Sequence, residues 1–176
     1  STAEKAAVVT SIGPGSLQAL AASLVPASNG LGVWYLFGDE TTEDEGFNMQ
    51  QIPKHEQGSF LQLSATMGRA YSLHTPLALP TALQRGAAVV DHPTRPAPFY
   101  LLLPMNTQAA WLPDFNLDEL PSASSADLGA AEGDYIQAAQ WIRTAERVII
   151  KVGGGGRHAG PALMTLLDRS GGVLVH

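Results

Sequence analysis

The chain contains no cysteine, which excludes disulfides, thiolate metal ligands and a cysteine nucleophile. This absence agrees with a cytoplasmic location. No apolar run approaches the ~18 residues that a membrane span requires, and the first residues lack the basic and apolar segments of a signal peptide. We therefore expect a soluble cytoplasmic protein that has no membrane partner.

Charged side chains are also scarce, at 15% of the residues, and the acidic ones exceed the basic ones to give a net charge of −6. The sequence shows no lysine and arginine cluster that would neutralise phosphates, which argues against nucleic acid as a partner. Apolar residues make up 45% of the 176 residues. This fraction is sufficient for a buried core and does not indicate disorder.

Two segments of the chain follow the order of strand, glycine turn and helix. The apolar strand Arg147–Val152 leads into Gly153-Gly154-Gly155-Gly156, and the strand Val8–Thr10 leads into Gly13-Pro14-Gly15. Turns of this kind let the backbone approach a phosphate or a dinucleotide at a helix N-terminus. They predict an α/β fold of parallel sheets flanked by helices, which is the Rossmann-like class.

Hydrophobic periodicity and turn residues predict the other elements. Continuous apolar runs at 31–37 and 99–104 are typical of strands that are buried on both faces. Shorter strands are expected at 6–9, 69–73 and 173–175, and helices at 15–25, 59–63, 80–91, 134–144 and 161–169.

Residues 109–133 contain prolines and the run Ser122–Ser125 but few periodic apolar positions, which is typical of a linker. We expect one partial α/β domain over residues 1–108 and a second over 134–176. The first and last predicted elements, at 6–9 and 173–175, are apolar strands of the kind that helices normally cover. The sequence thus suggests an excerpt of a longer polypeptide.

Three motifs occur along the chain in a characteristic order. Thr10-Ser11-Ile12-Gly13-Pro14-Gly15 is similar to a T-S-G-P-G turn with one inserted residue, and Phe99–Pro104 is similar to a G-P-V-x-L-x-L-P strand. Arg147–Gly155 resembles A-x-x-P-V-I-x-x-G-G-G. In this order and spacing the motifs, which span nearly the whole chain, resemble the thiamine-diphosphate enzymes of the acetolactate synthase type.

The resemblance implies that residues 1–108 are the C-terminal part of a pyrimidine-binding domain and that 134–176 open a central domain. The parent enzyme would be a lyase or transferase that uses thiamine diphosphate and Mg²⁺. It would cleave or form a C–C bond next to the carbonyl of a 2-keto acid or a related compound, as a homodimer or homotetramer. Gly38-Asp39 and Met49-Gln50-Gln51-Ile52 also resemble the G-D and L-Q-Q of the trihydroxycyclohexanedione hydrolases, a branch that is an alternative within the family.

The resemblance also implies roles for particular residues. Gly13, Pro14 and Gly15 would lie beside the pyrimidine end of the cofactor, and Gln50 or Gln51 matches a glutamine that reaches toward a partner subunit's active site. Gly153, Gly154, Gly155 and Gly156 match a loop that holds FAD in the flavin-containing members. The alternatives are an ordinary βα turn, a surface glutamine and a loop whose glycines serve only strand-to-helix packing.

No catalytic residue of the family is expected in this chain. The family's catalytic glutamate lies upstream of the G-P-G turn, and its G-D-G…N segment, which holds the diphosphate and Mg²⁺, lies far downstream. The chain by itself should therefore be inactive.

A competing hypothesis is a non-catalytic module of the same fold class that binds FAD or NAD or serves as a scaffold. No metal ligand is expected in either case. The acidic residues at 39–45 lack the ligand spacing of a calcium loop and favour a solvated loop. The five histidines are scattered and are interpreted as surface or structural residues.

Overall fold

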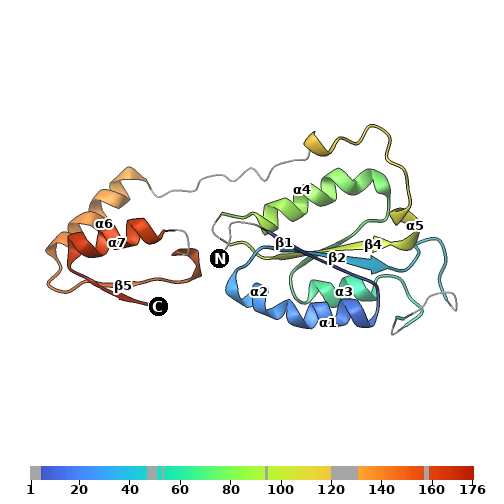
Figure 1. Ribbon diagram of the computed structural model, residues 1–176, viewed down its shortest axis with the longest axis horizontal. Coiled ribbons are helices and arrows are strands. Elements are labelled where there is room, and N and C mark those ends of the chain that lie inside the picture. The colour runs from blue at the N-terminus through green and yellow to red at the C-terminus, as the bar shows by residue number, and fades with distance from the viewer. Residues whose placement is uncertain (1–4, 47–50, 53, 94, 120–130, 157–158) are drawn as a thin grey trace. The chain divides into compact units, whose positions relative to one another are not determined.

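A computed structural model describes residues 5–46, 51–52, 54–93, 95–119, 131–156 and 159–176. The chain divides into two compact units, with the boundary between Ser125 and Ala126. Each unit has its own sheet, and every strand pairing in both sheets is parallel (Figure 1). The predicted α/β class with helices flanking parallel strands is confirmed. Whether the units are a pyrimidine-binding and a central domain stays a prediction.

The larger unit contains a four-stranded sheet of order β1-β2-β4-β3. Three helices cover one face of this sheet, and α4 covers the other (Figure 1). The strands are β1 (Ala6–Thr10), β2 (Val33–Asp39), β3 (Arg69–Ser72) and β4 (Pro98–Pro104). The helices are α1 (Pro14–Ala22), α2 (Leu24–Asn29), α3 (Ser59–Ala65) and α4 (Leu79–Val90). Shorter helical turns are η1 (Pro76–Ala78), α5 (Met105–Gln108) and η2 (Leu117–Glu119).

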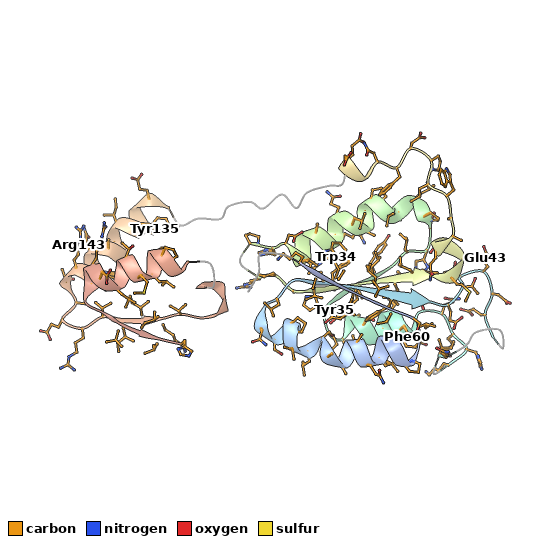
Figure 2. The ribbon with its side chains drawn as sticks, viewed as in Figure 1. Trp34, Tyr35, Glu43, Phe60, Tyr135 and Arg143 are labelled. Atoms are coloured by element: carbon orange, nitrogen blue, oxygen red, sulfur yellow. The ribbon has the colours of Figure 1, made fainter. Side chains whose placement is uncertain are left out.

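Two apolar clusters fill the space between the sheet and its helices. Alternate side chains of β4 enter opposite clusters, because successive residues of a strand point to opposite faces. Tyr100 and Leu102 pack on the side of α1 and α3, whereas Phe99 and Leu101 pack on the side of α4. Figure 2 shows the same division on β2, where Trp34 lies toward α4 and Tyr35 lies on the opposite side.

The Tyr100 hydroxyl forms a buried link between the central strand and the helices. Ser23, at the junction of α1 and α2, donates its hydroxyl proton to the Leu20 carbonyl oxygen at 2.5 Å. Ser23 Oγ lies 2.6 Å from Tyr100 Oη, and since its own proton is committed, the Tyr100 hydroxyl donates in this pair. Burial raises the pKa of Tyr100 above its ordinary value, so the hydroxyl stays protonated at neutral pH.

Two expectations from the sequence are wrong in detail. The segment expected to form one helix over 15–25 forms two, because α1 ends at Ala22 and α2 begins at Leu24 and runs through Pro26 to Asn29. Proline is tolerated there, since the first-turn N–H groups of a helix have no intrahelical acceptor. The strand at 6–9 is not buried either: β1 is an edge strand, and Val9 is 72% exposed.

The smaller unit is a βαβ unit preceded by a helix. Its elements are α6 (Glu132–Thr144), β5 (Ile149–Lys151), a short turn η3 (Gly154–Gly156), α7 (Gly160–Ser170) and β6 (Val173–Val175). Ile149 and Val173 pair across the two strands, and both are more than half exposed. None of the described residues of this unit is buried. The unit therefore has no enclosed core of its own within the part of the chain described.

Candidate functional site

The carboxyl ends of the parallel strands define one edge of the larger sheet, and ligands of α/β proteins commonly bind outside this edge. The segments that follow β1 and β2 lie next to each other there, because these strands are neighbours in register from Ala6 opposite Val33 to Thr10 opposite Phe37. The glycine turn follows β1, and two carboxylates follow at the end of β2. This edge is the candidate site.

Gly13 has a backbone conformation and a packing environment that require glycine. Its φ is 81° and its ψ is −131°, in a region that L side chains rarely adopt. A Cβ atom on Gly13 would lie 2.7 Å from Gln51 Oε1 and 2.8 Å from Gln51 Cβ. The structure thus places against each other two site residues that the sequence analysis selected from distant parts of the chain.

Gln51 itself has a φ of 57°, a left-handed conformation that costs free energy in a residue other than glycine. Its side chain is exposed, so it is accessible at the edge. Pro14 and Gly15 follow Gly13 in the first turn of α1. Gln50 lies outside the described residues, so its predicted role is not examined by the structure.

The N-terminus of α1 has polar groups without intramolecular partners. No side-chain hydrogen bond caps the helix, whose first N–H groups have no acceptor within the helix itself. Ser16 Oγ instead donates to the Gly13 carbonyl oxygen at 2.9 Å, which stabilises the turn. Thr10 Oγ1 is buried and has no hydrogen-bond partner within the described part of the chain. Donors are therefore available to a polar ligand that approaches this turn.

Asp39 is the last residue of β2 and is half-buried. Burial raises the pKa of its carboxyl group above the ordinary value. Two interactions lower this pKa by less than burial raises it: the Glu40 N–H donates to Asp39 Oδ1 at 3.0 Å, and His74 interacts electrostatically with the carboxyl group. A half-buried carboxylate with a raised pKa at a strand end is a candidate functional group.

Glu40 is only 3% exposed, so the expectation of a solvated acidic loop is wrong for this residue. It holds for Glu43, Asp44 and Glu45, which are exposed. Sequence reasoning did not select Thr10 or Glu40 as site residues. The available signal was their position at the ends of adjacent parallel strands.

The loop after β2 is attached to the segment after β4 by a reciprocal pair of hydrogen bonds. The Thr42 N–H donates to Asn106 Oδ1 at 3.0 Å, and Asn106 Nδ2 donates to Thr42 Oγ1 at 2.9 Å. Farther along the loop, the Gln57 N–H donates to Glu45 Oε1 at 3.0 Å, and Gln57 Nε2 donates to the Thr41 carbonyl oxygen. These bonds constrain the backbone that carries the buried carboxylate.

The second predicted site, Gly153-Gly154-Gly155-Gly156, belongs to the smaller unit and lies between β5 and α7. A Cβ atom on Gly156 would lie 2.5 Å from Val152 Cγ1, so packing explains that glycine. A Cβ atom on Gly153 or Gly155 would have no atom within 4 Å. Packing within the described residues does not explain these two glycines.

The described residues show neither a metal-binding group nor a helix that could cross a membrane. They contain no group of three histidine, aspartate or glutamate side chains that could hold a metal ion. Within the same ranges, every helix is too short or too polar to cross a membrane.

Comparison with protein-family models gives no match, and comparison with curated protein sequences gives none either. The site must therefore be interpreted from its own residues and geometry.

Gly13→Ala is expected to destabilise the larger unit more than Gly58→Ala. Both glycines have a φ of +81°, but Gly58 has a ψ of 6° in the left-handed helical region, where alanine costs about 1–2 kcal/mol, and Gly13 has a ψ of −131° outside that region, where alanine costs more. Gly58 has no atom within 4 Å of an added Cβ, whereas Gly13 has Gln51. The difference in unfolding free energy, measured by urea denaturation, reports the greater backbone strain at Gly13 together with its contact with Gln51. Equal losses in the two variants would contradict that contact.

Asp39→Asn is expected to raise the free energy of unfolding at neutral pH. The raised pKa means that the folded state disfavours the charged carboxylate, and asparagine removes that charge. The gain should diminish as pH falls through the raised pKa and vanish below the ordinary value of 3.8, where the carboxyl is protonated in both states. Urea denaturation over this pH range tests the prediction, with Glu43→Gln as an exposed control from the same loop. A loss of stability at neutral pH would show that the carboxylate is stabilised by its surroundings.

Proposed function

We propose that this chain is part of a thiamine-diphosphate-dependent enzyme of the acetolactate synthase type. The carboxyl edge of the four-stranded sheet would face the pyrimidine end of the cofactor. The observation that carries the proposal is the contact between Gly13 and Gln51 at this edge. The family resemblance independently places the glycine turn and a glutamine of this segment near the active site.

The chemistry of the edge fits one end of such a cofactor. The uncapped first turn of α1 offers N–H donors, and Thr10 Oγ1 is a buried hydroxyl that lacks a partner among the described residues. Gln51 lies against Gly13, so its amide is a further polar group beside this turn. These groups suit the ring nitrogen and amino substituents of a pyrimidine.

Bound thiamine diphosphate would supply the stabilisation of a carbanion next to the substrate carbonyl. The residues of this chain would orient its ring and exclude water. In the family that the chain resembles, a downstream segment would hold Mg²⁺ and the diphosphate. Asp39 at the end of β2 favours the trihydroxycyclohexanedione hydrolase-like alternative within the family, since the G-D pair of that branch is present here. The substrate class proposed is 2-keto acids or related carbonyl compounds.

The carboxyl edge of the sheet in the chain alone is expected to bind thiamine diphosphate and Mg²⁺ poorly, because most of the affinity for this cofactor should come from its charged diphosphate. Calorimetric titration of the chain, with amide chemical shifts to locate binding at this edge, is the measurement. Micromolar binding, equivalent to about −8 kcal/mol, would show that the fragment or its site has been misplaced.

The proposal predicts a positive result for a longer polypeptide that also contains the downstream G-D-G segment. It should bind the cofactor and convert a 2-keto acid. Gly13→Ala should lower its rate by roughly tenfold or more, because a displaced ring loses its alignment. The control Gly58→Ala should leave the rate unchanged. A longer polypeptide that does not bind thiamine diphosphate would contradict the proposal.

A second function, dinucleotide binding by the smaller unit, is favoured by the environment of Gly153 and Gly155. Neither glycine has an atom within 4 Å of an added Cβ, so the absence of side chains leaves room at the start of α7. FAD in a flavin-containing enzyme, or FAD or NAD in a non-catalytic module, would use this room for its pyrophosphate.

Gly155→Leu is expected to abolish the amide shifts that FAD causes near 153–156, because the added side chain would fill space that is open around the Cβ position among the described residues. Titration of the chain with FAD, followed by amide chemical shifts, measures this and separates this loop from any other site. Gly133→Leu, at a position equally open in α6, is the matched control and should retain binding. If the wild-type chain binds no FAD, FAD is not a ligand of this loop.

A further inference from the structure

A basic groove lies on the larger unit between β3 and the C-terminal half of α4. Its cavity volume is about 780 Å³. Arg69, Arg85 and Arg95 line it, together with Tyr71 and Val89. Arg69 begins β3, so the groove lies toward the amino ends of the strands, at the end of the sheet opposite the candidate cofactor site.

The concentration of positive charge in this groove is unusual for this chain. The chain has ten lysines and arginines in all and a net charge of −6, yet three of its arginines line one groove, and among the described residues no carboxylate lines it. The expectation that basic residues do not cluster is therefore wrong for the folded chain. The three arginines come from β3, from α4 and from the segment after α4, and the fold brings them to one groove.

None of these arginines forms an ion pair within the described residues, where the ion pair found is Lys5 with Asp91 at 3.8 Å. The Arg85 guanidinium lies over the Tyr71 ring, 5.1 Å from its centroid, which orients the guanidinium but leaves its charge uncompensated. A cation near the C-terminus of α4 would interact favourably with the helix dipole. That explanation does not extend to Arg69, which comes from β3.

The geometry points to a binding site for a small organic phosphate. Guanidinium groups donate in a fixed planar fork that matches phosphate oxygens, and one phosphate can accept from more than one arginine. The cavity volume falls within the range of small-molecule sites. We propose that the phosphate binds the arginines and that an apolar or aromatic part of the ligand lies against Tyr71 and Val89.

The test uses the full chain with ADP as the probe, followed by calorimetry and by amide chemical-shift mapping. ADP should shift the amides of β3 and of the C-terminal half of α4, and raised salt should weaken its binding. Adenosine, which lacks phosphate, should bind at least about tenfold more weakly, because charge-assisted hydrogen bonds are lost. Inorganic phosphate should shift the same arginine amides without those of Val89.

Arg69→Gln and Arg85→Gln should each weaken ADP binding by about tenfold. Both side chains are exposed, so the fold should be retained, and an unchanged amide spectrum away from the groove verifies this. Arg143→Gln, an exposed arginine of the smaller unit, is the control and should have no effect (Figure 2). Arg85→Lys should recover only part of the affinity, because lysine keeps the charge without the fork.

Three results would overturn the proposal. One is the absence of shifts in the groove with millimolar ADP and inorganic phosphate. Another is ADP binding that both glutamine variants leave unchanged or that shifts only amides near 153–156. The third is binding of a single-stranded oligonucleotide in the groove without binding of ADP, which would indicate a macromolecular partner.

Discussion

The burial of β4 on both faces is the constraint on which the larger unit depends. This strand pairs with β2 on one side and β3 on the other, so its alternate side chains must satisfy two different helical layers. Tyr100 is a buried residue with an apolar ring and a polar hydroxyl, and both are satisfied. Its ring stacks on Tyr35 with centroids 5.1 Å apart, and its hydroxyl forms a hydrogen bond with Ser23. The β2 strand that pairs with β4 also pairs in register with β1, and this second pairing aligns the strand ends that carry the candidate site.

The sequence predicted the elements whose formation depends on local patterns. The continuous apolar run at 99–104 identified β4, and the spacing of apolar residues identified α4 and α7. What could not be predicted depends on tertiary packing. Nothing local to Glu40 distinguishes it from the exposed Glu43, and its burial follows from its position directly after β2. The division of the segment 15–25 into α1 and α2 could not be predicted, because a proline in the first turn of a new helix has the same local signature as one that follows the end of a helix.

The two functional surfaces differ in how far sequence reasoning could reach them. Gly13 and Gln51 were selected one by one through a family resemblance, and their contact in space is a fact that only the fold supplies. The basic groove has no motif at all, since its arginines come from β3, α4 and the segment after α4. Composition even argued against it, because a net charge describes the whole chain and not the distribution of charge on its surface.

The two glycine turns show how a fold separates structural glycines from those that are available to a ligand. At Gly13 the positive φ and the proximity of Gln51 already require glycine, so the residue would be needed even if no ligand bound there. At Gly153 and Gly155 neither a positive φ nor a nearby atom imposes that requirement. A glycine in a short turn lowers stability through its conformational entropy, and at Gly153 and Gly155 packing within the described residues does not compensate, which leaves the backbone accessible to a ligand. By this reasoning the glycine loop of the smaller unit is the stronger indication of a ligand, although the turn after β1 carries the more specific family motif.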